Sequence, residues 1–240
     1  RFMPNDPIIR GDLAIIIDRM LGLSKITYNY FRDLYTNDYY RESVLRCVAA
    51  GYINGVGENK VNPRGNATRE EVAVILCRIF NIDTTYSGST GFKDDSSISS
   101  WARSSVYALS RLGYLNGTPD GKVNPKSNIT RAEMITLLNN FADTYIPRVD
   151  GDDSGSVFVS NFPKNIVVGR NITLNNTTVG RDIYLTQSAS TLSLRDTKVL
   201  GRIVCFEDVN LALVNTEVSN ITLLSEKSEI YGVSDSIGEI

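Results

Sequence analysis

The 240-residue sequence contains no histidine and only three cysteines, Cys47, Cys77 and Cys205. Without histidine, neither a Ser-His-Asp triad nor a Cys-His pair can form. The cysteines lie far apart and lack CxxC spacing, which excludes the usual zinc sites and argues against a disulfide framework. Cys47 and Cys77 fall within helical apolar patterns, so we expect buried small hydrophobic side chains there. The sequence indicates no cofactor.

Long apolar runs and a strong charge excess are also missing. No stretch approaches the roughly 20 apolar residues that span a bilayer. The net charge is −2, which disfavours nucleic acid as a partner. The chain starts at Arg1 without a signal-peptide pattern, so we expect a processed product or a piece of a longer protein.

Internal repeats dominate the first half of the chain. The segment "GYINGVGENKVNPRGNATREE" (51–71) aligns without a gap with "GYLNGTPDGKVNPKSNITRAE" (113–133). A stretch with helical apolar spacing precedes each copy. The N-terminus matches the second half of this unit, with Arg10 aligned to Arg69. We therefore predict three copies, the first without its first helix, at about 1–25, 28–84 and 90–146.

These repeats resemble the S-layer homology family, whose copies run from an F-D-W opening through a G-Y-x-D-G turn to an I-T-R-A-E motif. The resemblance covers residues 1 to about 145 and is closest in the third copy, which has Phe92, Asp94, Trp101 and "GTPDGKVNPKSNITRAE". The second copy departs from it, with Tyr39 or Tyr40 in place of tryptophan. The resemblance implies an all-α pseudo-threefold domain whose inter-repeat grooves bind secondary cell-wall polymers, commonly bearing ketal-linked pyruvate.

Capping boxes are predicted where the second helix of each later copy begins. Thr68 with Glu71, and Thr130 with Glu133, have the spacing that satisfies the free amides of a first helical turn. The first copy has Ile9 at the threonine position and therefore lacks a hydroxyl cap worth about 1 kcal/mol.

An arginine follows each cap position, at Arg10, Arg69 and Arg131. A cation at the first position of a helix opposes the helix dipole by some tenths of a kcal/mol. Its recurrence suggests an anion, which free amides and a guanidinium together would bind. The alternative is that each arginine packs on the neighbouring repeat and pairs with a local acid.

By position, the family resemblance implies that Arg69 and Arg131 grip a carboxylate, and we include Arg10 with them. The same resemblance implies that further residues line the groove and bind the polysaccharide: Trp101, Tyr39, Asp33, Asp94, Gly55 and Gly117. The residues themselves leave other roles open: core aromatics for the first pair, turn or helix caps for the aspartates, and turn positions for the glycines. Because the first copy is incomplete, we expect two functional grooves at most.

Residues 147–156 are rich in Asp, Gly and Ser, which predicts a linker. Asp150, Asp152 and Ser154 mimic the first ligands of an EF-hand loop, a weak calcium candidate. Asn161 replaces the closing glutamate, however, so the linker interpretation is favoured.

A second repeat occupies residues 157–240. Apolar side chains recur every 19 to 20 positions at Ile172, Leu192, Leu211 and Ile230, within segments of strand-like alternation. This period predicts a parallel β-solenoid, with an antiparallel β-sandwich as the alternative. The pattern still runs at Ile240, so we expect the native chain to continue, or the open end to self-associate.

We therefore predict a multidomain bacterial surface protein, extracellular and located at the cell wall. The helical repeats would anchor it non-covalently to an anionic polysaccharide, and the solenoid would act as stalk or interaction surface. One alternative is a polysaccharide-degrading enzyme on the solenoid, with Asp196 and Asp208 approaching each other across stacked coils. Another is an adhesin or assembly protein.

Overall fold

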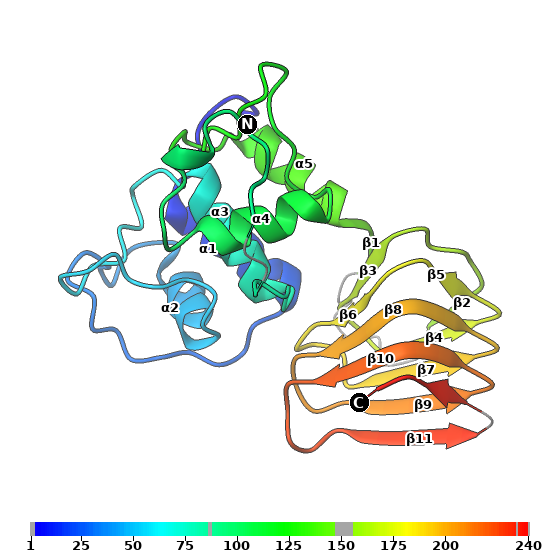
Figure 1. The fold of residues 1–240 in the computed structure, drawn as a ribbon. Helices are drawn as coiled ribbons and strands as arrows, with labels where there is room; N and C mark the ends of the chain where they lie inside the picture. Colours follow the sequence, from blue (N-terminus) through cyan, green and yellow to red (C-terminus); the bar gives the residue numbers. More distant parts are fainter. Residues whose placement is uncertain (1–2, 86–87, 147–155, 234, 240) are drawn as a thin grey trace. The chain divides into compact units, whose positions relative to one another are not determined.

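The computed structural model describes residues 3–85, 88–146, 156–233 and 235–239. The chain divides into two compact units (Figure 1). The helical unit comprises residues 1–19 and 24–140, and the β unit comprises residues 20–23 and 141–240. The predicted multidomain architecture, helical repeats followed by an all-β region, is confirmed.

Five α-helices follow the repeat pattern in the sequence. They are α1 (Arg10–Leu21), α2 (Arg41–Ala49), α3 (Arg69–Ile79), α4 (Arg103–Arg111) and α5 (Arg131–Phe141), and a short 3-10 helix, η1 (Asp95–Ser97), precedes α4. Helices α2 and α4 open the second and third copies. The first copy contributes only α1, as its sequence predicts.

The three copies close into a ring of backbone hydrogen bonds. The N–H of Ile8 donates to the carbonyl of Ile129 at 3.0 Å, that of Ala67 to Ile8 at 2.9 Å, and that of Ile129 to Ala67 at 2.9 Å. These residues occupy equivalent positions in the three copies, and each is fully buried. Each copy therefore contacts both of the others around one axis, which confirms the expected pseudo-threefold arrangement.

Every strand pair in the described β unit is parallel. One sheet has the order β1-β3-β6-β8-β10-β12 with β5 beside β8, and the other has the order β11-β9-β7-β4-β2. The antiparallel sandwich is therefore wrong, and the parallel solenoid is confirmed. The strands are β1 (Ala142–Ile146), β2 (Ser156–Phe158), β3 (Asn165–Val168), β4 (Ile172–Asn175), β5 (Thr178–Val179), β6 (Ile183–Leu185), β7 (Thr191–Arg195), β8 (Lys198–Cys205), β9 (Asn210–Val214), β10 (Glu217–Leu223), β11 (Glu229–Val233) and β12 (Ser236–Ile237).

The register of the solenoid follows the sequence period. Ile172 pairs with Leu192, Leu192 with Leu211, and Leu211 with Ile230. Stacking like on like gives the coils a continuous apolar interior.

One corner of the solenoid uses a repeated Asn/Asp-Thr turn. Asp196 has a left-handed φ of 47°, which aspartate and asparagine tolerate better than most residues. The hydroxyl of the buried Thr197 then donates to the carbonyl of Arg195 at 2.8 Å. Thr177 and Thr216 make the same bond in the neighbouring coils. Side chains thus satisfy the corner backbone in each coil.

The boundary between the units lies earlier than predicted. Strand β1 (142–146) pairs with β3, so these residues belong to the solenoid and not to the third helical copy. The predicted linker lies outside the described residues except for Ser156, which begins β2. The calcium candidates Asp150, Asp152 and Ser154 also lie outside them.

All three cysteines are free and buried, as expected for Cys47 and Cys77. Burial raises the pKa of Cys77 and of Cys205 to about 12. Within the described residues, no group of three or more histidine, cysteine or acidic side chains gathers as a metal site. In the same part of the chain, no helix has the length and apolar character needed to cross a membrane.

Candidate functional site

The guanidinium of Arg10 joins the first copy to the second. Its Nε donates to the carbonyl of Val61, its Nη2 to that of Asn54, and its Nη1 to the Glu71 carboxylate, each at 3.0 Å. Only 6% of Arg10 is exposed. Burial lowers the pKa of Arg10, and the neighbouring Glu71 carboxylate acts in the opposite direction. Each of the three guanidinium nitrogens of Arg10 thus donates a hydrogen bond to the second copy.

Arg69 makes the same contacts one copy further on. It donates to the carbonyls of Val123 at 2.8 Å and Asn116 at 3.3 Å, and to the Glu133 carboxylate at 3.3 Å. Arg131 continues the cycle to the first copy, where, among the described residues, its Nη1 donates to the Asp12 carboxylate at 2.9 Å. The residue aligned with Asn54 and Asn116 would precede position 1, and the residue aligned with Val61 and Val123 is Phe2, which lies outside the described residues.

The helix N-termini do not offer free amides to an anion. The N–H of Arg10 donates to Gly65, that of Arg69 to Ser127, and that of Arg131 to Asp6, at 2.9 to 3.0 Å. The next amide of each helix also donates to a neighbouring copy, at the carbonyls of Pro63, Pro125 and Pro4. The expectation of free helix amides is therefore wrong. Arg10, Arg69 and Arg131 each bond one copy to the next, which matches the alternative interpretation, while binding of a glycan by these arginines stays a prediction.

Both predicted capping boxes are present. The Glu71 carboxylate accepts from the N–H of Thr68 at 2.7 Å, and the Thr68 hydroxyl accepts from the N–H of Glu71. Thr130 and Glu133 repeat this pair of bonds. Each glutamate uses one oxygen for its own helix and the other for the arginine of the preceding copy. The carboxylate thus links local helix formation to assembly of the ring.

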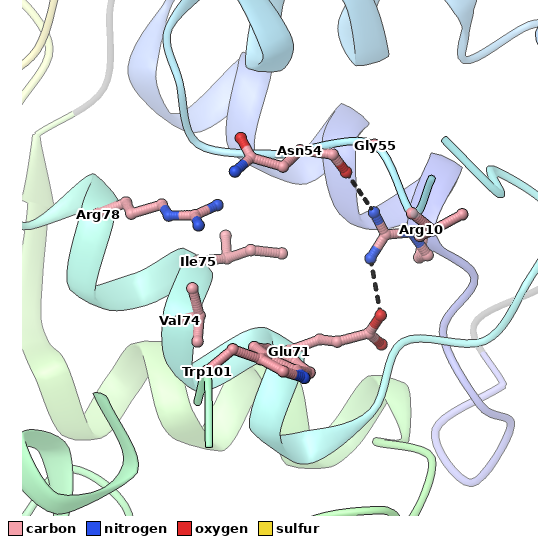
Figure 2. Close-up of a pocket in the computed structure, with 9 residues that line it drawn as sticks. Arg10, Asn54, Gly55, Glu71, Val74, Ile75, Arg78 and Trp101 are labelled. Atoms are coloured by element: carbon pink, nitrogen blue, oxygen red, sulfur yellow. Dashed lines mark hydrogen bonds and ion pairs between the residues drawn. The ribbon is translucent and has the colours of Figure 1, made fainter. Parts of the chain in front are cut away.

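A cleft of about 450 Å³ opens where the three copies meet (Figure 2). The first copy contributes Arg10, the second contributes a turn and one face of α3, and the third contributes Trp101. Figure 2 shows Arg10 and Arg78 on opposite sides of the cleft. The lining residues are Arg10, Asn54, Gly55, Val56, Glu71, Val74, Ile75, Arg78 and Trp101.

The two aromatic candidates are surface residues. Trp101 is 56% exposed and Tyr39 is 71% exposed, so the alternative of core anchors is wrong. Tyr39 occupies the place aligned with Trp101, but its hydroxyl donates to Asp12 at 2.6 Å. This hydrogen bond raises the pKa of Tyr39 to about 12. Tyr39 therefore lies near Arg131 and Asp12, away from the cleft that Trp101 lines.

The aspartates and glycines shape the turns. Asp33 accepts from the amides of Val61 and Asn62 at 3.0 and 2.7 Å. Asp94 accepts from the equivalent amides of the third copy at 2.9 and 2.8 Å. These contacts match the turn-capping alternative.

A Cβ on Gly55 would lie 2.9 Å from the Lys60 carbonyl, and one on Gly117 would lie 2.5 Å from the Phe92 ring. Glycine therefore lets each turn pack closely, and Gly55 also lines the cleft.

Arg78 is a cleft residue that the motif alignment did not single out. It lies in the last turn of α3, and its Nη1 donates to the carbonyl of Tyr52 at 3.3 Å. The one feature of the sequence that pointed to Arg78 was its alignment with Arg19, which lies in the last turn of α1. Because the repeat motif ends before this turn, the alignment alone gave no reason to choose it.

The aligned positions around Arg69 and Arg131 lack parts of this cleft. Near Arg69, the counterpart of Trp101 would precede position 1. Near Arg131, the counterpart of the Asn54 turn would do the same. Among the described residues, arginine, turn and exposed aromatic come together at Arg10, and the expectation of at most two functional grooves stays a prediction.

The solenoid keeps its two candidate acids apart. Asp196 follows β7 and Asp208 precedes β9, with the whole of β8 between them, so they occupy different corners. A polar cleft of about 610 Å³ runs along the Asp196 corner. There Asn215 donates to Asp196 at 2.7 Å, and Lys198 pairs with Glu217 at 2.5 Å. The approach of Asp196 to Asp208 is therefore wrong.

Comparison with known proteins concerns the helical half. Residues 30–73 and 91–135 match the S-layer homology domain family. Over 143 residues the chain is 36% identical to an amylopullulanase of Thermoanaerobacterium thermosulfurigenes, which covers 58% of this chain and 8% of that protein.

Two further relatives are named for surface functions. Identity is 29% to an S-layer protein of Bacillus thuringiensis subsp. finitimus, covering 57% of this chain and 17% of the relative. Identity is 27% to a cellulosome-anchoring protein of Acetivibrio thermocellus, and the match covers 58% of this chain and 32% of that protein. The chain thus spans a third or less of each of these three relatives.

S-layer homology domains anchor surface proteins to the cell wall, and proteins that carry them are associated with the cell surface or S-layer. The predicted surface location is therefore confirmed. The N-terminal half of this chain contains S-layer homology domains, and a parallel β-solenoid follows them.

Proposed function

We propose that the helical unit holds a bacterial surface protein non-covalently on the cell wall by binding an anionic secondary wall polysaccharide in the Arg10–Trp101 cleft. The observation that supports this most directly is the composition of the cleft. An exposed indole lies in the same concavity as two guanidinium groups, so one ligand can meet an apolar ring and a positive charge together. The family resemblance favours a ketal-linked pyruvate as the acidic group.

The ring explains why the cleft is preformed. Arg10 bonds to the turn and to α3, while α3 carries Val74 and Ile75 on the cleft wall. Walls built on hydrogen-bonded elements lose little conformational entropy when a ligand binds. Direct contact of Arg69 or Arg131 with the glycan stays a prediction, and their bonds support a role in joining the copies.

The test is retention on purified cell walls of the source organism, before and after chemical removal of the non-peptidoglycan polymer. We expect the wild type to bind intact walls, more strongly at low salt, and to lose binding when the polymer is removed. Trp101→Ala should weaken binding about tenfold, which corresponds to about 1.4 kcal/mol. Tyr28→Ala, which removes an aromatic that is 85% exposed and lies outside the cleft lining, is the matched control.

Two results would overturn the proposal. One is wild-type binding that survives removal of the polymer. The other is a folded Trp101→Ala variant that binds like the wild type.

We propose that the solenoid serves as a stalk or interaction surface without catalysis of its own. Activity assays on polyuronates and mucin-type glycans test this, and turnover of either substrate would contradict it. Self-association through the last coils also stays a prediction, which sedimentation at rising protein concentration would check.

A further inference from the structure

We infer that Arg78, in the last turn of α3, is the cation that meets the acidic group of the ligand in the Arg10–Trp101 cleft. This inference rests on the proposed function and assigns the charge contact within it. It differs from the sequence-based expectation, which gave that contact to arginines at the first helical position.

The state of the two cleft arginines supports this assignment. Arg10 is nearly buried, donates to three protein acceptors, and lies 3.0 Å from the Glu71 carboxylate. A ligand carboxylate at Arg10 would have to displace one of these acceptors and would lie beside the negative charge of Glu71. Arg78 is exposed and donates a hydrogen bond to the carbonyl of Tyr52 at 3.3 Å. Within the described residues, the structure gives it no ion pair.

The charges that line the cleft also favour Arg78 as the residue that meets the acidic group. Its charged lining consists of Arg10, Glu71 and Arg78, with a net charge of +1. Because Arg10 and Glu71 pair with each other, the uncompensated charge lies on Arg78.

The orientation of the side chain agrees. Figure 2 shows the Arg78 guanidinium pointing into the cleft from the side opposite Arg10. Val74 and Ile75, from the same helix, line the wall between the two arginines. A sugar resting on Trp101 and these aliphatic side chains would present an acidic substituent to Arg78, whose planar fork suits a carboxylate.

A simpler role for Arg78 is to stabilise the C-terminus of α3 through the helix dipole. Arg19 allows the two roles to be separated, because it lies in the last turn of α1 at the aligned position and is exposed. The dipole role predicts similar effects for Arg78→Gln and Arg19→Gln. The ligand role predicts that only Arg78→Gln changes binding.

The experiment measures binding of the full chain to purified walls of the source organism, in parallel with walls whose carboxylates have been amidated with carbodiimide and methylamine. We expect amidation to weaken wild-type binding at least tenfold, the size of one charge-assisted hydrogen bond. Arg78→Gln should bind intact walls at that weaker level and show no further loss on amidation. Arg78→Lys should recover part of the difference, and Arg19→Gln should behave like the wild type.

Each other outcome is informative. If a folded Arg78→Gln variant keeps wild-type affinity and its sensitivity to amidation, the assignment to Arg78 is wrong while polysaccharide anchoring stands. Polymer-dependent binding that ignores amidation would show that the ligand is met without a charge contact, which also overturns the assignment. If the wild type binds walls that have lost the polymer equally well, the proposed function fails and this inference fails with it.

Discussion

The two units of this chain use sequence repeats in opposite ways. In the helical unit, three unequal copies close into a ring, and the hydrogen bonds of Ile8, Ala67 and Ile129 return to their start. In the β unit, coils add in one direction, and the described strands pair with strands of neighbouring coils. A ring brings side chains from three copies to one point, whereas a stack repeats one environment along a line.

This difference determines where a ligand site can form. The cleft combines Arg10, the Asn54 turn and Trp101, which come from three copies and lie far apart in the sequence. The solenoid corner repeats an Asn-Thr or Asp-Thr pair in three successive coils, where Asn215 donates to Asp196 and each threonine hydroxyl donates to a backbone carbonyl. Closure of unequal copies therefore produces a site that no single copy contains.

The largest expected effect tests whether the units are independent. Leu194→Ala removes a side chain that is fully buried between Leu174 and Leu213 in the solenoid stack. We expect a loss of about 2–5 kcal/mol of unfolding free energy from transfer and cavity terms. Trp101, the single tryptophan, reports the helical unit by fluorescence, while circular dichroism follows both units. Urea titrations should show a shifted dichroism transition and an unshifted fluorescence transition; equal shifts in both would refute independence.

The next largest effect concerns closure of the ring. Arg69→Ala leaves two carbonyls and the Glu133 carboxylate without their donor, and we expect a cost of about 1.5–3 kcal/mol. Arg131→Ala removes one ion pair from a side chain that is 33% exposed, so the expected cost is about 0–1 kcal/mol. Urea denaturation followed by Trp101 fluorescence measures the free energy of unfolding of the two variants. Equal costs would mean that the turn carbonyls contribute nothing.

A smaller effect isolates local helix formation from ring contacts. Thr68→Ala removes the hydroxyl that caps α3 but leaves every Arg10 and Arg69 hydrogen bond in place. We expect about 1 kcal/mol of destabilisation, and a similar value for Thr130→Ala. Thermal and urea unfolding of the two variants measure this. A cost matching that of Arg69→Ala would indicate that the cap also holds the ring together.

The smallest effect distinguishes the Tyr39 position from the Trp101 cleft. The hydrogen bond to Asp12 raises the folded-state pKa of Tyr39 to about 12, above the unfolded value near 10. Its stabilising contribution is therefore complete below pH 10 and is lost as pH rises from 10 to 12. An ultraviolet titration of tyrosinate should show that Tyr39→Phe lacks one group titrating near pH 12. A missing group near pH 10 would contradict the hydrogen bond.

Local patterns predicted the parts of this structure that depend on neighbours in sequence. The capping boxes of Thr68 and Thr130 follow from spacing within one helical turn, and the solenoid register follows from stacking apolar positions that recur every 19 to 20 residues. The role of the arginines was less accessible, because a guanidinium at a helix start suits an external carboxylate and an internal one equally well. Only the contacts of Arg10 and Arg69 show that the acceptors lie in the next copy.

By itself, the sequence determined the helical repeats, the capped helix starts at Thr68 and Thr130, the period of about 20 residues in the β region and the likeness to S-layer homology domains, since these depend on short spacings and simple periods. The tertiary structure alone decided that β1 belongs to the solenoid, that Trp101 lines one cleft with Arg10 and Arg78, and that Tyr39 is hydrogen-bonded to Asp12. The physical reason is that these contacts join residues from different copies or coils. Their distances depend on how the copies pack, which no spacing along the chain encodes.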